Sequence, residues 1–589
     1  MAQLAEQHGD VMTLNMGGGE AQPWVVLSSP DAVYEAFVLK GIDFSGRPMV
    51  PSMKVSSGNG QGFAQPTLTP ELKALRRTAF GSLFDAPRVR RASNELEAEA
   101  ALLADHLVLS SGKGGVELRP ALRRAVTNMV LRYVFSARVP FATEGAAAAS
   151  SGSSHFEELV EVVDEIWSVL TATPTTMADL LAGPSVADAY YAAAPLQGLV
   201  RRRDALLRSL VAQRRQQLSA QSAGGTHDGA AGDMLDVLLG AKLTDAEVLY
   251  TLVDLFVAGV NTVSTALEWM LLLTTAAPQV QARARADALA AAARGDDEAE
   301  APAYVRALLQ ETMRAKPPLL LPRTAVVDSS IGGYAVRKGQ VVLANNWALT
   351  HGARWWEAPS AFRPERWLEE ERAPLQGAEA CKFIPYSVGR RACPGSRLAQ
   401  AELDAAALTL LRRVRWTRAA DGPLDLSEEY SLTLKPRRSQ SLCFERLATP
   451  ADSTPSRDGR PVRHRASASR RTATTASPTL AARAPTPTMD GASPSPPIER
   501  TSGGGGSAGS GGRGGSGGDG RPTRRQRLEA DEVGEASERL QEAGRDRRGG
   551  WRASKAKGVR RNRRYEKRLL RGVGDDLSDA DGGLWDDEY

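Results

Sequence analysis

The stretch that decides the fold is FIPYSVGRRACPGSRLAQAEL, which runs from Phe383 to Leu403. It holds Cys393, one of only 3 cysteines in 589 residues, in a loop bracketed by Gly389 and Gly395. The alanine- and leucine-rich residues that follow, Ser396 to Val414, predict a buried helix. Cys393 therefore stands at the N-terminal end of a helix, where the positive end of the dipole favours a thiolate over a thiol.

A stabilised thiolate in a loop is either a nucleophile or a metal ligand, whereas most single cysteines are inert core residues. Arg390 and Arg391, shortly before Cys393, also favour the anion. A nucleophile needs a histidine base, and none of the 6 histidines stands in an evident pairing with this cysteine. Cys381 and Cys443 follow no zinc or disulfide spacing, and so few cysteines suit a reducing compartment. The sequence therefore favours a metal ligand.

The residues around Cys393 resemble the haem-binding loop of the cytochrome P450 family, F-x-x-G-x-R-x-C-x-G. Every fixed position matches, including Gly389 and Gly395, except the first, where Tyr386 replaces phenylalanine. The resemblance implies haem b as cofactor, with the Cys393 thiolate as axial ligand of the iron. It also implies that Arg391 pairs with a haem propionate, because a guanidinium fork suits a carboxylate.

Two further motifs stand in the order and spacing of the same family. The first is the pair Glu311 and Arg314, an E-x-x-R motif that places an acid and a base on one helical face. On its own, such a pair is most often a solvated surface ion pair. The second motif, Pro364-Glu-Arg366-Trp, resembles the family segment P-E-R-F. The resemblance implies that Glu311, Arg314 and Arg366 form a buried structural triad behind the haem.

A long central helix is the fourth element. The capping box Thr244–Glu247 begins an apolar pattern that runs to Pro278, about 50 Å of helix at 1.5 Å per residue. The alternative is a membrane span. The charged residues Asp254 and Glu268 lie within the pattern, and charges at membrane depth are costly, so a helix that crosses a soluble core fits better.

Within this helix, Ala258-Gly259-Val-Asn261-Thr262 resembles the oxygen-binding groove of the family, A-G-x-D/E-T. The resemblance implies that Gly259 lets a ligand approach the backbone, and that the Thr262 hydroxyl binds dioxygen and passes a proton. Asn261 stands where the family has an acid. Because an amide cannot titrate, the proton relay is altered at its acid end.

Weaker similarities extend toward the start of the chain. Two short strands and a helix from Asp31 to Leu39 resemble the first sheet of the family. Leu72-Lys-Ala-Leu-Arg76 stands where a W-x-x-x-R helix is expected, which implies that Arg76 is a second propionate partner. Arg323 is a third candidate; the alternative is a surface arginine. The expected fold is mainly α with small β-sheets, a cytochrome P450-like haem domain over residues 1–447.

The composition changes after this domain. Residues 448–522 form a Ser/Pro/Gly/Arg linker, and residues 523–589 a disordered or partly helical tail with a basic run and an acidic end. The basic run, residues 555–568, favours a solvated tail over nucleic-acid binding. Much of the formal net charge of +5 could reside there, so that charge says little about the catalytic domain.

The first residues, Met1 to His8, enter the domain without an apolar stretch of about 20 residues or a signal-peptide pattern. Eukaryotic microsomal members of the family usually carry an N-terminal membrane anchor. We expect that the sequence begins inside a longer protein rather than representing a soluble form. The expected location is intracellular: the endoplasmic-reticulum membrane if the native form has an anchor, and otherwise the cytoplasm.

The resemblance implies a haem-dependent monooxygenase that inserts one oxygen atom of O2 into a small apolar substrate. Neither end of the chain holds a flavin or nicotinamide fingerprint, so the electrons come from a separate NADPH-dependent reductase or ferredoxin. We expect a basic face to steer this partner, formed by Lys73, Arg77, Lys382 and Arg390.

Two alternatives remain. Asn261 in the oxygen groove suggests a haem-thiolate isomerase or dehydratase that rearranges lipid hydroperoxides without a reductase. The basic run near the C-terminus suggests a non-catalytic haem-domain scaffold with a nucleic-acid-binding tail. The sequence does not identify the substrate.

Overall fold

The computed structural model describes residues 2–15, 23–62, 81, 83–112, 114–144, 153–172, 195–223, 232–241, 243–295, 301–318, 321–368, 376–419, 424–430 and 433–447. The chain divides into a unit of residues 1–458 and a second unit of residues 459–588. All described residues belong to the first unit. The predicted linker and tail, from residue 448 onward, lie outside the described residues.

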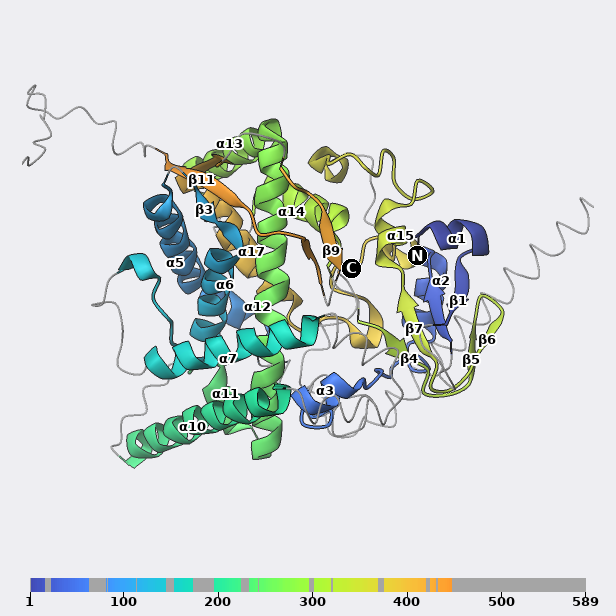
Figure 1. The fold of residues 1–589 in the computed structure, drawn as a ribbon, viewed down its shortest axis with the longest axis horizontal. Coiled ribbons are helices and arrows are strands. Elements are labelled where there is room, and N and C mark those ends of the chain that lie inside the picture. Colours follow the sequence, from blue (N-terminus) through green and yellow to red (C-terminus); the bar gives the residue numbers. More distant parts are fainter. Residues whose placement is uncertain are drawn as a thin grey trace, which may run out of the picture. The chain divides into compact units, whose positions relative to one another are not determined.

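The described part is mainly helical, with small β-sheets (Figure 1). The helices are α1 (Ala2–His8), α2 (Pro30–Tyr34), η1 (Glu35–Leu39), α3 (Pro51–Ser56), α5 (Ala86–Ser110), α6 (Leu118–Phe135), η2 (Ala142–Glu144), α7 (Ser153–Thr171), α10 (Leu196–Ala223), α11 (Met234–Gly240), α12 (Asp245–Ala276), α13 (Pro278–Arg294), α14 (Ala303–Ala315), α15 (Asn346–His351), η4 (Pro364–Trp367), α16 (Gly377–Ala380), η5 (Gly389–Arg391) and α17 (Ser396–Arg413). The predicted fold class is confirmed.

The strands form four small sheets. They are β1 (Val11–Leu14), β2 (Trp24–Leu27), β3 (Val116–Glu117), β4 (Arg323–Thr324), β5 (Ser329–Ile331), β6 (Tyr334–Val336), β7 (Val341–Ala344), β8 (Val414–Arg418), β9 (Glu428–Tyr430), β10 (Leu434–Pro436) and β11 (Ser441–Arg446). The sheet orders are β1-β2-β7-β4, β3-β11-β8, β10-β9 and β5-β6. Only the pairing of β2 with β7 is parallel among the described strands.

Helix α12 is the long central helix expected from the sequence. The Thr244 hydroxyl accepts a bond from the Glu247 N–H at 3.2 Å, and the Glu247 carboxylate accepts one from the Thr244 N–H at 2.8 Å. This capping box starts a helix of 32 residues, which ends at Ala276, just before Pro278. By length and composition α12 could cross a membrane, but 67% of its most apolar window is buried inside the protein. It therefore serves as a core helix.

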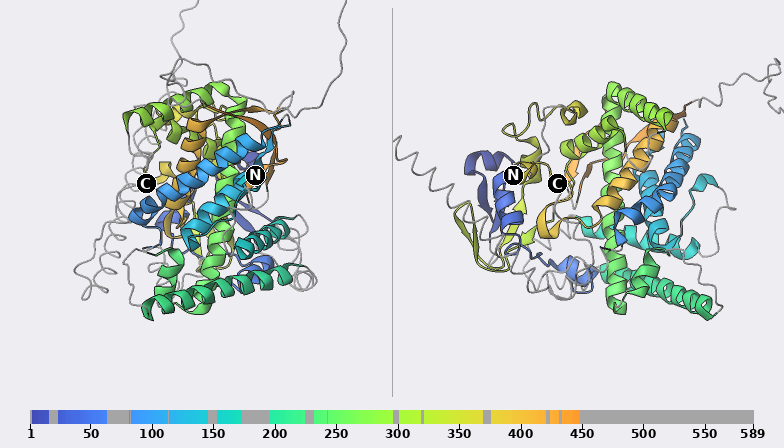
Figure 2. Two further views of the ribbon diagram at one scale, coloured as in Figure 1. Left: turned by 90° about the vertical axis from the view of Figure 1, so that its left-hand side faces the viewer. Right: turned by 180° about the vertical axis from the view of Figure 1, so that it is seen from behind.

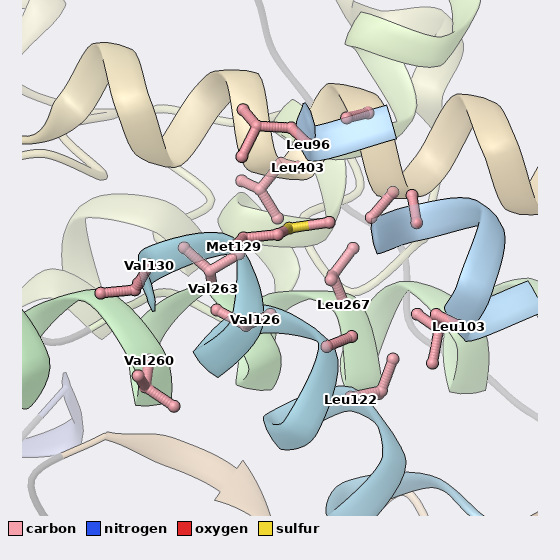
Figure 3. Packing of buried hydrophobic residues seen from close by; sticks show 14 of the residues in the cluster. Leu96, Leu103, Leu122, Val126, Met129, Val130, Val260, Val263, Leu267 and Leu403 are labelled. Atoms are coloured by element: carbon pink, nitrogen blue, oxygen red, sulfur yellow. The ribbon is translucent and has the colours of Figure 1, made fainter. Parts of the chain in front are cut away.

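The larger hydrophobic core surrounds α12. Figure 1 shows α5, α6 and α17 on one side of it, and Figure 3 shows their side chains meeting around Met129. The labelled residues around it come from α5, α6, α12 and α17, and they are Leu96, Leu103, Leu122, Val126, Val130, Val260, Val263, Leu267 and Leu403. Because neighbours pack on most sides of α12, its sequence is apolar nearly all round rather than along one stripe.

A second core joins the sheet β1-β2-β7-β4 to α2 and η1. Its buried residues include Leu27 of β2, Phe37 of η1 and Val342 of β7. The expected helix from Asp31 to Leu39 begins at Pro30 and changes to a wider π-helix from Glu35, where the Lys40 N–H reaches back five residues to the Glu35 carbonyl. This core holds Phe37 and β4 beside the cysteine loop.

Candidate functional site

Cys393 lies in a loop that hydrogen bonds hold in one shape. Its N–H donates to the Tyr386 carbonyl at 2.8 Å, and the Ala392 N–H donates to the Gly389 carbonyl at 2.9 Å. The Cys393 side chain is exposed, and α17 begins three residues later at Ser396. Cys381 is buried, and desolvation raises the pKa of its thiol to about 12. Cys393 is therefore the better placed of these two to offer a thiolate to a ligand.

Gly389 is required by the shape of this loop. It adopts φ of +67°, and a Cβ there would lie 2.0 Å from the carbonyl oxygen of Phe37. Gly395 differs, since its φ is −89° and the nearest atom to its Cβ position is 3.8 Å away on Phe84. The backbone thus explains the first glycine of the pattern and not the second.

Two arginines predicted to contact a propionate are buried at the cysteine loop. Arg391 belongs to the loop, and Arg323 donates to its backbone. The Arg391 Nε donates to the Ser45 carbonyl at 2.7 Å. Arg323 donates through Nη2 to the Val388 carbonyl at 2.5 Å and to Ser387 Oγ at 3.1 Å. Its side chain is fully buried, so the surface alternative for Arg323 is wrong.

Among the described residues, no acid balances the charge of Arg323. Desolvation, followed by the charges of Arg47 and Arg391, lowers the pKa of Arg323. Its Nε is buried, with no hydrogen-bond partner in the part of the chain that the structure describes. Among the described residues, no carboxylate forms an ion pair with this guanidinium. Buried cations are costly unless paired, so this site fits an anionic ligand, as the propionates of haem would supply.

The structure brings Glu311, Arg314 and Arg366 together, from α14 and η4. The Glu311 carboxylate accepts from Arg314 Nε and Nη2, each at 2.9 Å, and from Arg366 Nε at 3.1 Å. At most 2% of each of these side chains is exposed, so the cluster is not a surface ion pair. Sequence reasoning missed Trp367, whose indole N–H donates to Glu311 at 2.9 Å. Tryptophan in place of the family phenylalanine was the available signal.

The residues of the oxygen-groove motif point in different directions. Thr262 is half-buried, and its hydroxyl donates to the carbonyl of the exposed Ala258 at 2.8 Å. Asn261 is 5% exposed, and its Nδ2 is buried with no hydrogen-bond partner among the described residues. A Cβ on Gly259 would lie 3.1 Å from Val130 of α6, so this glycine permits close helix packing, a different reason from the ligand approach expected. Of the motif residues, Ala258 is exposed and Thr262 half-buried, so these two lie on the open side of α12.

The remaining predicted residues differ in their exposure and contacts. Tyr386 is half-buried, and its hydroxyl donates to Gln400 Oε1 at 3.1 Å. Arg390 is exposed, as a docking face requires. The placement of Lys382 on that face was wrong, because its side chain is 8% exposed and pairs with Glu379 at 2.7 Å. Lys73, Arg76 and Arg77 lie outside the described residues.

Sequence reasoning also missed three buried ionisable residues away from the loop. Arg203 and Asp204 form an ion pair in the apolar surroundings of α10. Glu402 of α17 is 1% exposed, and its Oε1 has no partner. The sequence did hold a signal for the burial of Arg203. Its helical spacing from Val200 and Leu207 places it on the buried side of α10.

Comparisons with known proteins show the family and the fold. The family model described as "Cytochrome P450" matches residues 1–444. The chain is 31% identical to cytochrome P450 76M5 of Oryza sativa subsp. japonica, over 73% of this chain and 84% of that protein. It is 27% identical to steroid 17-alpha-hydroxylase/17,20 lyase of Ictalurus punctatus, over 74% of this chain and 84% of that protein. A solved structure of a zebrafish cytochrome P450 with abiraterone has a TM-score of 0.61 and 26% identity, and covers 76% of this chain and 98% of that one.

Proposed function

Because the chain belongs to the cytochrome P450 family, we propose that it inserts one oxygen atom of O2 into an apolar organic substrate with electrons from a separate reductase. One observation carries the proposal. Cys393 is exposed on a hydrogen-bonded loop that also holds the buried Arg391, and the buried Arg323 donates to the backbone of the same loop at Val388. A thiol and two guanidinium groups in this arrangement suit the iron and the propionates of one haem.

The residues that would hold haem b are Cys393 as thiolate ligand, with Arg391 and Arg323 for the propionates. Arg76, outside the described residues, is proposed as a further propionate partner. Haem bound through a thiolate supplies reductive activation of dioxygen. Gly389 keeps the loop close to Phe37, and the buried triad around Glu311 anchors η4 to α14. The chain thus fixes the ligand loop before any substrate binds.

Thr262 is the residue proposed to handle protons. Its hydroxyl lies on the open side of α12 and already donates to the Ala258 carbonyl, so an oxygen lone pair remains to accept a hydrogen bond from water. Asn261 lies on the buried side and cannot ionise. We therefore propose that an ordered water, and not the side chain at position 261, delivers protons to Thr262.

The electron donor is proposed to be a separate NADPH-dependent reductase or ferredoxin. Arg390 beside the cysteine loop is exposed and can steer an acidic partner, whereas Lys382 is withdrawn into its pair with Glu379. We propose an intracellular location for the protein, as such an electron donor requires. We also propose that the protein associates with a membrane through an N-terminal anchor.

An isomerase that needs no reductase is the second candidate, and Asn261 favours it. Such an enzyme rearranges a hydroperoxide that already contains both oxygen atoms, so it needs no ionisable acid to deliver protons to dioxygen. The half-buried hydroxyl of Thr262 supports the monooxygenase instead.

The test uses the full-length holoprotein with a reductase, NADPH and isotopically labelled dioxygen. Apolar ligands are first selected by their difference spectra, and mass spectrometry then measures label in the product. A monooxygenase gives product with one labelled oxygen atom, only when the reductase is present. Conversion of lipid hydroperoxides without reductase would replace the proposal with the isomerase, and purified protein that takes up no haem would favour the non-catalytic scaffold.

A further inference from the structure

Helix α7 carries a row of acidic side chains on its outer face. Glu157, Glu161 and Glu165 are all exposed and recur every four residues, so they are neighbours along one side of the helix. Like charges at this spacing repel one another, so this acidic row weakens the helix unless a cation lies against it. Among the described residues, the ion pairs of α7 use Glu158 and Asp164 and leave the acidic row without a bonded cation.

Helix α10 carries a row of basic side chains. Arg201, Arg208 and Arg215 are exposed and stand seven residues apart, about two helical turns, which places them on one side of the helix. Arg215 pairs with Asp245 at the start of α12. In the part of the chain that the structure describes, Arg201 bonds the neutral Gln197, and neither Arg201 nor Arg208 pairs with an acid. This basic row therefore keeps most of its charge.

The two helices that carry these rows lie side by side (Figures 1 and 2) and share a buried apolar cluster. At their surface, Glu158 of α7 pairs with Arg202 of α10 at 2.7 Å. The hydrogen bond to Glu158, and more weakly the charges of Glu165 and Glu161, raise the pKa of Arg202. The acidic row thus lies on the same outer surface as Arg202.

The acidic row and the basic row lie at opposite edges of this surface. Arg202 lies on the side of α10 toward α7, and the basic row lies about 100° further round the helix, on the side toward α12. The strip between them holds the exposed small residues Ala205, Ser209 and Ala212. Small side chains let another helix approach closely, because the distance between packed helices depends on the side chains at the contact.

We propose that this surface binds the same surface of a second copy of the chain, so that the protein forms a symmetric dimer through α7 and α10. A twofold axis that runs along the two helices, midway between them, exchanges the two edges. The acidic row of each copy then lies on the basic row of the other, and the pairing occurs twice. A twofold axis across the helices would place like charges together, which repulsion disfavours. This inference does not depend on the proposed monooxygenase function.

The size of this surface predicts a weak dimer. Helix α7 has 19 residues, which is about 28 Å at the helical rise, and two packed helices are about 20 Å wide. The contact therefore covers about 550 Å² on each copy, less than the roughly 800 Å² of a standard interface. We expect a dissociation constant on the order of 10 µM, with charge pairs supplying much of the attraction.

Sedimentation velocity of the full-length holoprotein measures this dissociation constant without any variant. At about 50 mM salt we expect a monomer–dimer equilibrium that shifts toward dimer as the protein concentration rises. At about 500 mM salt the dissociation constant should rise about tenfold or more, because salt screens exposed charges. The wild type alone thus tests whether a dimer forms and whether charge holds it.

Two charge reversals test which surfaces meet. Glu157→Lys with Glu161→Lys makes both edges of the surface basic, and Arg201→Glu with Arg208→Glu makes both edges acidic. Each variant alone should be monomeric, because like charges then face each other across the twofold axis. An equimolar mixture of the two variants should recover most of the dimer, since every basic edge again meets an acidic one.

The matched control is Arg90→Glu with Arg91→Glu, which reverses two exposed arginines of α5. It changes the net charge as much as the reversal in α10 does, and it should leave the dissociation constant within about twofold of the wild type. Circular dichroism and haem content of each variant show that it is folded.

Several results would overturn the proposal. One is a wild type that stays monomeric at about 100 µM in low salt. Others are a dimer that salt does not weaken, a dimer that survives both charge reversals, and a mixture of the two variants that stays monomeric. A monomeric wild type that binds vesicles of anionic phospholipid, with binding lost in Arg201→Glu, Arg208→Glu, would assign the basic row to a membrane surface instead.

Discussion

Glu311→Gln is the most informative change in the buried triad. The carboxylate of Glu311 accepts hydrogen bonds from Arg314 Nε and Nη2, Arg366 Nε, the Arg363 N–H and Trp367 Nε1. The glutamine has the same shape, but it removes the negative charge that two buried guanidinium groups share. Removing one partner of a buried ion pair costs about 3–5 kcal/mol. The whole free energy of unfolding of a domain is about 5–15 kcal/mol, so the variant should be marginally stable.

Urea unfolding followed by tryptophan fluorescence measures this loss, because Trp356 and Trp367 border the triad. The matched control is Glu158→Gln, the same chemical change in an exposed pair with Arg202, which should leave the free energy of unfolding nearly unchanged. We expect the triad variant to lose about 3 kcal/mol or more and to retain less haem. A Glu311→Gln protein as stable and as haem-loaded as the control variant would refute the structural role given to the triad.

Three further predictions concern single positions. Gly389→Ala should lose haem, because its Cβ would meet the Phe37 carbonyl at 2.0 Å, whereas Gly377→Ala, with φ of +59° and nothing within 4 Å, should keep it; pyridine haemochrome spectra compare the two, and equal haem content would contradict the clash. Burial raises the pKa of Glu402, which faces the neutral Tyr133, so its folded form stays protonated while the unfolded chain ionises. The contribution of Glu402 to the free energy of unfolding should therefore be largest at acid pH and fall by about 1.4 kcal/mol per pH unit between its unfolded and folded pKa values, so the wild type and Glu402→Gln should differ by this slope in urea unfolding; equal slopes would contradict this. Thr262→Ala should raise the fraction of electrons lost as peroxide, whereas Asn261→Asp should hold or improve coupling, measured as NADPH oxidised, peroxide released and product formed; unchanged coupling in Thr262→Ala would contradict its role.

The cysteine loop and the triad could be predicted from the sequence because their spacing is short. Gly389 and Cys393 lie in one ten-residue pattern, and the i, i+3 spacing of Glu311 and Arg314 already places them on one helical face. The ends of α12 were predictable for the same reason, since the capping box at Thr244 and the stop at Pro278 are local signals.

Burial and partner choice could not be predicted in the same way. Lys382 and Arg390 look alike in the sequence, and only the fold turns Lys382 toward Glu379 and the ring of Trp356. Arg203 Nη1 is buried with no hydrogen-bond partner among the described residues. Its burial depends on where α10 meets α12, which is a contact between segments that are distant in the sequence. The π-helix from Glu35 has no signal that we can name in the sequence.

The measurement that tests the central claim most directly is the spectrum of carbon monoxide bound to the ferrous protein. Thiolate ligation by Cys393 predicts the strongly red-shifted Soret band that a cysteine-bound haem gives. Cys393→Ser should lose this band, and the matched variant Cys443→Ser should keep it. A red-shifted band that persists in Cys393→Ser, or a wild-type holoprotein without such a band, would contradict the assignment of Cys393 as the iron ligand.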